Sequence, residues 1–322
     1  MSLKGTNFSI KSVDDLIRCL SLASLLELGA WPKPGNIHRT RDFERTRFEH
    51  FLAGITAIQP NFREFCENIM QTSFKNEGDF ERIRIGKFFK KAAEEMMKWQ
   101  RGGNVLLGHI LILAPLAAAS AICLKTKKFY ITDLRKNLIK VIDNASVDDT
   151  INLFKAIRLC NPGGLGTIEK YDINNEGSLN EIISDNIKLK KIFELSKERD
   201  LISSEYYNGF TIIFDEGLPY FLKLFNQNND INLSIVNTYL KLLASHPDSL
   251  VIRKSGLESA LNISKKALSI LEVGGISSEK GLKLTIQLDN DLQIKKGKLN
   301  PGTTADLISG VIFCALLFGL RF

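Results

Sequence analysis

The sequence has few of the features that divide a chain into loosely joined parts. Its 322 residues include only eight prolines, and it contains no glycine- and serine-rich linker, low-complexity tract or internal repeat. We therefore expect one domain that spans residues 1–322. The five cysteines are scattered without a Cys-x-x-Cys pair, which predicts buried free thiols in a reducing compartment.

Several catalytic and binding motifs are also missing. The four histidines show no metal-ligand spacing, which argues against a zinc site. The sequence lacks the GxxxxGK[ST] pattern of a Walker A loop, a GxSxG nucleophile and a Cys/His nucleophile signature. Residues 1–15 include no apolar stretch of the kind found in secretory signals, so we expect a cytoplasmic protein.

The composition is otherwise ordinary for a soluble globular protein, with 25% charged and 44% hydrophobic residues. The formal net charge is +7. Such a charge fits an anionic small ligand, a nucleic acid or an acidic surface equally well, so it does not identify the partner.

Apolar residues recur mostly at a spacing of three to four, which predicts an all-α, multi-helix globular domain with buried central helices. Asp133 and Asp148 are placed to cap two of these helices. Residues 211–214 have the propensity of a strand, but no partner strand is evident, so we interpret 206–225 as helical. The expected helices are 16–28, 43–58, 83–99, 133–142, 148–159, 187–195, 231–243, 255–272, 277–288 and 307–320.

Residues 105–124 form a run of twenty without a formal charge, which is long enough to span a bilayer. The run contains His109, Pro115 and many small residues. We favour a helix that is buried on all sides in a soluble protein, and a membrane-spanning helix is the alternative.

The loop between the first two expected helices concentrates polar groups. Pro32 and Pro34 exclude a helix there, and the Pro34-Gly35-Asn36 sequence is typical of a tight turn. A stiff loop of this kind suits a ligand site, and a sharp corner with a solvated basic rim is the alternative. Its polar side chains are Lys33, Asn36, His38, Arg39, Arg41 and Asp42.

Glycine-rich breaks occur at residues 101–104, 161–166 and 300–304. The first and third each precede a long apolar helix, where free N–H groups and the helix dipole would favour phosphate. Thr303 or Thr304 could cap the last of these helices, with Asp306 in its first turn. Simple helix capping is the alternative for each break.

Carboxylates near these breaks could hold a divalent cation that bridges phosphates. Asp42, Asp248 and Asp306 are the candidates, since Mg²⁺ typically takes one or two carboxylates together with phosphate oxygens and waters. Arg253 and Lys254 add a cationic pair near Asp248. The alternatives are favourable carboxylates at helix N-termini and a solvated helix face.

Five short motifs occur in an order that resembles one family. They are KPGNIHR, GGNxxxG, PGGLG, HPDSLVIRKxG and NPGTTADL, and the likeness extends over about residues 16–320. The chain is similar to the ATP:dephospho-CoA triphosphoribosyltransferase family, closest to its archaeal branch. The resemblance implies an all-helical soluble enzyme in which a ribose hydroxyl of dephospho-CoA attacks the anomeric carbon of ATP's ribose and adenine leaves.

The resemblance also implies a set of site residues. Catalytic roles fall to His38, Asp42 and Asp248, and a Mg²⁺ ion falls to Asp248 and Asp306. Nucleotide binding falls to Lys33, Pro34, Gly35, Asn36, Arg39, Asn104, Gly108, Gly163, Gly164, Arg253, Lys254, Gly302, Thr303 and Thr304.

The sequence departs from the bacterial motifs at several polar positions. His38 stands where bacterial members usually have aspartate, Val105 and Leu106 replace Thr and His, and Leu250 and Arg253 replace Asn and His. These changes keep two alternatives open: a related enzyme for another nucleotide or phosphoribosyl substrate, and a nucleotide-binding paralogue without catalysis.

A third hypothesis is a nucleic-acid-binding protein, which should present a basic stripe on an exposed face. An enzyme should instead gather Lys33, Asp42, Asp248 and Asp306 in one pocket. We expect the small nucleotides ATP and dephospho-CoA as partners, with no membrane or nucleic acid. The oligomeric state stays open, a homodimer included.

Overall fold

The computed structural model describes residues 8–322, and these residues form fifteen α-helices and three short 3₁₀ or π segments. Within that range the only β-type pairing is an isolated bridge between His38 and Arg41, so the predicted all-α globular fold is confirmed. The helices are α1 (Val13–Gly29), α2 (Phe48–Gln71), α3 (Ile85–Trp99), α4 (Leu107–Thr126), α5 (Ile131–Asp143), α6 (Val147–Cys160), α7 (Ser178–Ser184), α8 (Leu189–Ser196), α9 (Leu201–Asn208), α10 (Leu218–Asn228), α11 (Ile231–Ser245), α12 (Ser249–Ser255), α13 (Leu257–Glu272), α14 (Glu279–Gln293) and α15 (Gly302–Leu317).

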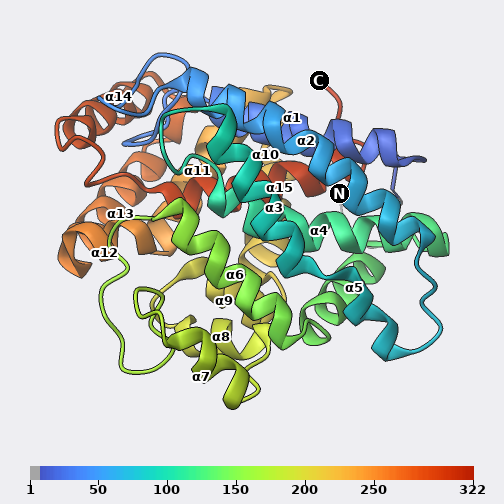
Figure 1. Ribbon diagram of the computed structural model, residues 1–322. Coiled ribbons are helices and arrows are strands. Elements are labelled where there is room, and N and C mark those ends of the chain that lie inside the picture. The colour runs from blue at the N-terminus through green and yellow to red at the C-terminus, as the bar shows by residue number, and fades with distance from the viewer. Residues whose placement is uncertain (1–7) are drawn as a thin grey trace.

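Two apolar helices, α4 and α15, form the centre of the molecule. They pack against each other and against α1, and the remaining helices surround them. In Figure 1, α15 crosses the middle of the view, with α1 and α2 above it and α6 to α9 below. By length and composition α4 could cross a membrane, but nearly all of it is buried inside the protein. The prediction of a buried central helix at residues 105–124 is therefore confirmed.

Pro115 lies inside α4 and has no N–H for the carbonyl of Leu111 one turn earlier. The hydroxyl of the buried Tyr206 donates to this carbonyl at 2.7 Å. The side chain from α9 thus satisfies a polar group that the proline would otherwise leave unpaired in the core.

The predicted helices are present, and most of their ends differ from the prediction by a few residues. The exception is α2, which was predicted to end at residue 58 but continues through Pro60 to Gln71. The short helices α7 and α12 were not predicted. Asp133 and Asp148 do not cap α5 and α6, because these helices begin earlier, after Tyr130 and Ser146. Both aspartates lie in the first helical turn, where the helix dipole favours a carboxylate.

The segment 206–225 is helical as predicted, although it is not one helix. Gly209 and Phe210 adopt positive φ angles and end α9, and a π segment then runs from Ile212 to Gly217. The carboxylate of Glu205 accepts hydrogen bonds from the backbone N–H groups of Ile212 and Ile213, at 2.8 and 3.0 Å. This buried carboxylate therefore holds the start of the π segment.

All five cysteines are free and buried, as predicted. The reducing compartment and the cytoplasmic location stay predictions. The expectation for residues 1–15 lies partly outside the described residues.

Candidate active site

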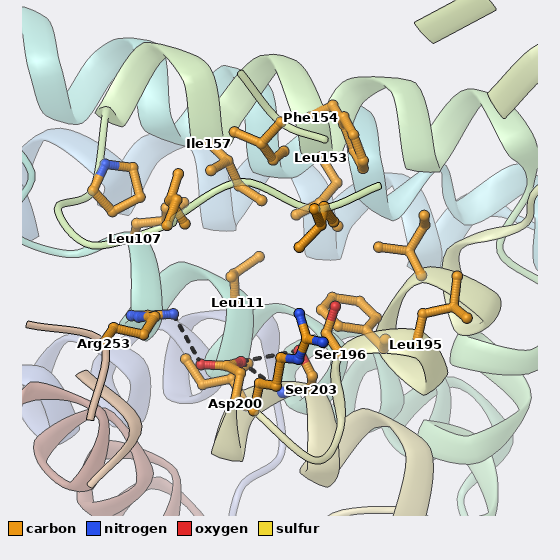
Figure 2. A pocket seen from close by; sticks show the side chains of 18 of the residues that line it. Leu107, Leu111, Leu153, Phe154, Ile157, Leu195, Ser196, Asp200, Ser203 and Arg253 are labelled. Atoms are coloured by element: carbon orange, nitrogen blue, oxygen red, sulfur yellow. Dashed lines mark hydrogen bonds and ion pairs between the residues drawn. The ribbon is translucent and has the colours of Figure 1, made fainter. Parts of the chain in front are cut away.

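A cavity of about 340 Å³ opens where α4, α6, α8, α9, α12 and α15 approach one another. The residues 162–173, which connect α6 to α7, form part of its rim. Figure 2 shows Leu153, Phe154 and Ile157 of α6 on one side, with Asp200 and Arg253 on the opposite side. The cavity thus has an apolar half and a polar end, and the polar end carries Asn104, Asp200, Arg253, Thr303 and Asp306.

Asp306 extends from the first turns of α15 into this polar end. Its carboxyl group rests on Gly108 of α4, where an added Cβ atom would lie only 1.8 Å from a carboxylate oxygen. Glycine is therefore required at this crossing of α4 and α15. Burial raises the pKa of the Asp306 carboxyl to about 7, and the nearby Glu27, Asp248 and Asp200 carboxylates act in the same direction against His109.

Three buried polar groups lie behind Asp306. The ammonium group of Lys33 forms an ion pair with the Glu27 carboxylate and donates to the Glu27 carbonyl oxygen at 2.9 Å. His109 Nε2 lies 3.3 Å from the same carboxylate, yet neither ring nitrogen has a hydrogen-bond partner among the described residues. We call Glu27, Lys33 and His109 the buried ionic group.

The charges of this group depend on one another. Burial opposes the ionised form of Glu27, but the charges of Lys33 and His109 leave its pKa below the usual value. Burial lowers the pKa of Lys33, and Glu27, Asp306 and Asp289 counteract this. Asp306 therefore lies within the electrostatic reach of Lys33, although Lys33 does not line the cavity. Lys33 is fully buried, so it does not belong to a solvated basic rim of the loop.

Sequence reasoning did not identify Glu27 or His109 as site residues. Glu27 continues the apolar spacing of Leu16, Leu20 and Ala23 on α1, and His109 is a single imidazole in the charge-free α4. A carboxylate on the buried face of a helix requires a partner. That requirement was a usable signal, and the partner is Lys33 from the following loop.

Asp248 is buried, and hydrogen bonds occupy both of its oxygen atoms. One oxygen accepts from the backbone N–H groups of Leu250 and Val251, at 2.9 and 3.1 Å. The other accepts from the N–H and the hydroxyl of Thr304, at 2.7 and 2.8 Å. Asp248 thus caps α12 and ties it to α15. These bonds use the lone pairs that a metal ion or a reacting hydroxyl would need, so the structure gives Asp248 a structural role.

The opening loop between α1 and α2 is fixed to the rest of the protein by hydrogen bonds. His38 is buried and its Nε2 lies 3.1 Å from Asp289, which also accepts from the N–H of Gly35 at 2.9 Å. The hydroxyl of Tyr239 donates to the Pro34 carbonyl at 2.9 Å. The loop is therefore held to α11 and α14, and His38 does not line the cavity.

Two further loop residues also lie away from the cavity. Asp42 is exposed and accepts from the N–H of Phe48 at 2.7 Å, at the start of α2. Arg39 is exposed and donates to Asn232 at 2.9 Å. Of the four residues expected to share one pocket, only Asp306 lines the cavity, and Asp42 is part of a helix terminus instead.

The glycine-rich breaks contribute more to the cavity than the opening loop does. The structure divides the residues predicted to bind nucleotide into two groups. Asn104, Gly108, Arg253 and Thr303 line the cavity, whereas Lys33, Pro34, Gly35, Asn36, Arg39, Gly163, Gly164, Lys254, Gly302 and Thr304 do not.

Simple helix capping describes the first break and not the third. Asn104 accepts from the N–H of Leu107 at 3.1 Å, beside the start of α4. Neither Thr303 nor Thr304 caps α15, because the helix begins after Pro301 and both threonines already lie in its first turn. Gly164 packs on Arg253, which places the second break beside the cavity.

Asp200 is a cavity residue that the sequence did not suggest. It caps α9 through the N–H of Ser203 at 2.9 Å, and it pairs with the guanidinium group of Arg253 at 3.2 Å. The Nε atom of Arg253 is buried and has no hydrogen-bond partner among residues 8–322. Arg253 thus has an unused donor at the polar end.

The donor set places a limit on any metal site. Within the described part of the chain, no three His, Cys, Asp or Glu side chains are grouped so that they could hold a metal ion. Asp306 is the one member of the predicted pair, Asp248 and Asp306, whose carboxylate faces the cavity. A Mg²⁺ ion would fit here only with substrate oxygens and water as most of its ligands.

An all-α fold with a deep cleft, an acid at its polar end and a buried ionic group behind that acid defines a helical small-molecule enzyme. Sequence comparison specifies the family. The chain belongs to the ATP:dephospho-CoA triphosphoribosyl transferase family, whose model matches residues 13–321.

The relatives of known name are consistent with this family. A probable 2-(5''-triphosphoribosyl)-3'-dephosphocoenzyme-A synthase from Salmonella typhimurium is 30% identical over 105 residues. That alignment spans about a third of either chain, 33% of this one and 34% of the relative. A probable synthase of the same name from Streptococcus pyogenes is 26% identical over 316 residues, which cover 95% of this chain and 98% of the relative.

A solved structure shares the fold. The crystal structure of a proposed triphosphoribosyl-dephospho-CoA synthase from Archaeoglobus fulgidus aligns with a TM-score of 0.62 and 26% sequence identity. The alignment covers 84% of this chain and all of the other.

Proposed function

We propose that the protein transfers the triphosphoribosyl group of ATP to a ribose hydroxyl of 3'-dephospho-CoA and releases adenine. The family match over residues 13–321 supports this reaction, as does a cleft with one acidic, polar end. In the reaction, the hydroxyl oxygen bonds to the anomeric carbon of ATP's ribose, and the bond from that carbon to adenine breaks. The hydroxyl loses its proton and the departing adenine gains one.

The observation that carries the proposal is the position of Asp306. Its carboxyl faces the cavity and lies close to Asp200, Asp248 and Glu27, so its ionised form can stabilise a positive charge that develops beside it. The ribose becomes cationic as adenine leaves, and a fixed carboxylate stabilises such a centre. With a pKa of about 7, the same carboxyl group can also accept the proton of the attacking hydroxyl near neutral pH.

We further propose that Mg²⁺ accompanies the triphosphate. When bound, the ion would neutralise part of the charge of the phosphates. Of the predicted pair Asp248 and Asp306, only Asp306 has a carboxylate that could serve as its ligand. Arg253 lines the same end of the cavity, where its guanidinium group could meet a phosphate oxygen.

A second candidate is a related transferase that acts on another nucleotide. The observation in its favour is Leu250, which lines the cavity at a position where the family resemblance suggests a polar side chain. An apolar side chain there removes a hydrogen-bonding group from the site and would change which substrate is accepted.

Adenine release tests these proposals directly. The protein is incubated with ATP and Mg²⁺, with and without dephospho-CoA, and free adenine is measured by chromatography. The proposed function predicts adenine only when both nucleotides are present, together with a product that carries the added triphosphoribosyl mass. Adenine release with another nucleotide acceptor, but not with dephospho-CoA, would support the second candidate.

A further inference from the structure

We propose that the apolar half of the cavity binds the pantetheine arm of the acceptor while the acceptor's ribose reacts at the polar end. This inference rests on the proposed function. It assigns a role to a surface that the transferred group, a sugar with a triphosphate, cannot use. The apolar half comprises Leu107, Leu111, Leu153, Phe154, Ile157 and Leu195, with Ile168 at the rim.

The two parts of the cavity differ sharply in chemistry. In Figure 2 the ion pair of Asp200 and Arg253 lies on one side, and the leucine, isoleucine and phenylalanine side chains of α4 and α6 face the rest of the space. A triphosphate requires cations and N–H donors, and these apolar side chains supply neither. A ligand that covers these apolar side chains is therefore uncharged and partly apolar where it meets them, although the cations Lys170 and Arg199 also line the cavity.

The exposure of two lining residues points to the same conclusion. Ile168 and Leu195 both line the cavity, and 42% and 54% of their surfaces are exposed. A bound ligand that covers these side chains gains about 25 cal/mol for each Å² of apolar surface removed from water. The site thus has apolar surface available for binding beyond the reacting centre.

The order of groups in dephospho-CoA matches this arrangement. Its ribose carries the reacting hydroxyl, two phosphates follow, and the pantetheine arm with its paired methyl groups comes last. With the ribose at Asp306, the phosphates can meet the guanidinium group of Arg253, which lines the same cavity. The arm then extends along the apolar half, where Ser196 also lines the cavity and can bond one of its amide groups. ATP has no such arm, so the two nucleotides are distinguished here.

Calorimetry on full-length protein tests the inference with two probes, dephospho-CoA and ATP. The double variant Ile168→Gln/Leu195→Gln makes the rim polar at positions exposed enough to leave folding intact. We expect its affinity for dephospho-CoA to fall at least fivefold while its affinity for ATP stays unchanged. Leu159→Gln is the matched control, because Leu159 is also 42% exposed and does not line the cavity. This control should change neither affinity.

An unchanged affinity for dephospho-CoA in the double variant would overturn the inference. So would an equal loss for ATP, because the surface would then bind the shared adenosine portion. Adenine release by the wild type is measured separately. Its absence would reject the proposed function, while a selective loss of dephospho-CoA binding would still support the arm site.

Discussion

Lys33 shows how burial changes the role of a single residue. Within the stiff opening loop its charge suggests a contact to a nucleotide phosphate, but the structure places it beside Glu27 in the core. Its removal would leave the Glu27 carboxylate buried without its cationic partner. A single substitution should therefore affect stability first and ligand binding only through the position of the buried ionic group.

We predict that Lys33→Ala lowers the free energy of unfolding by about 3–5 kcal/mol, the usual cost of breaking a buried ion pair from one side. Urea denaturation measures the change. The double variant Lys33→Ala/Glu27→Gln should recover part of the loss, since it removes the unpaired charge. Lys87→Ala, on an exposed position of α3, serves as the surface control and should be nearly neutral. If Lys33→Ala behaved like this control, the buried ion pair would be of no consequence for folding.

Asp306 is the residue at which Mg²⁺ and the nucleotide should meet. We predict that ATP binding depends on Mg²⁺ and that Asp306→Asn weakens the Mg²⁺-dependent part by a few kcal/mol, on the order of a lost charged hydrogen bond. Calorimetry with and without Mg²⁺ measures both effects. If the affinity for ATP were the same with and without Mg²⁺ in both wild type and variant, Asp306 would not be a metal ligand.

At the scale of elements, the centre of α4, which contains Pro115, depends on a side chain from α9. Tyr206→Phe removes the donor to the Leu111 carbonyl, which Pro115 cannot satisfy. We predict a loss of about 1–3 kcal/mol in the free energy of unfolding, the cost of one unpaired buried polar group.

A second substitution makes this prediction specific. Pro115→Ala restores an N–H for the Leu111 carbonyl, so Tyr206→Phe should cost less in that background. Tyr207→Phe, at the exposed neighbouring position, is the control. An equal cost of Tyr206→Phe with and without Pro115 would show that the hydroxyl acts in some other way.

The π segment after α9 should respond to pH through Glu205. Burial raises the pKa of this carboxyl from 4.5 to about 7, against hydrogen bonds from Ile212 and Ile213. Between these values the folded state binds more protons than the unfolded state, so stability falls as the pH rises from about 4.5 to about 7.

We predict that Glu205→Gln flattens this part of the pH dependence, by at most about 3 kcal/mol over the window. Urea unfolding at a series of pH values gives the slope, and the exposed Glu198→Gln is the control. If Glu205→Gln had the same pH dependence of stability as the wild type, Glu205 would not be the group responsible.

At the scale of the whole molecule, the local sequence pattern predicts the helices, whereas the site also depends on contacts between distant segments. Helical spacing is a local property, so the all-α fold and the buried α4 could be predicted from sequence. The breaks before α4 and α15 drew attention to Asn104, Thr303 and Asp306, which line the cavity, because a helix start that follows a glycine-rich turn leaves polar groups at a surface or a cavity.

The rest of the site depends on contacts between distant segments. Sequence cannot reveal that hydrogen bonds already occupy the oxygen atoms of Asp248, or that His38 pairs with Asp289, 251 positions away. Nor does a single carboxylate such as Glu27 or Asp200 look unusual within a helix or at its start. Some of the residues assigned by motif alone therefore line the cavity, and the others make structural contacts outside it.

The central claim is that the protein transfers the triphosphoribosyl group at the Asp306 end of the cavity. Its most direct test compares adenine release from ATP in the presence of dephospho-CoA by wild type, Asp306→Asn and Asp42→Asn, with folding checked by circular dichroism. We predict that Asp306→Asn loses at least a hundredfold in rate, since general acid–base catalysis contributes about 10²–10⁴-fold, while Asp42→Asn keeps near wild-type activity. Full activity in Asp306→Asn with loss in Asp42→Asn would place the reaction at the opening loop and contradict the account.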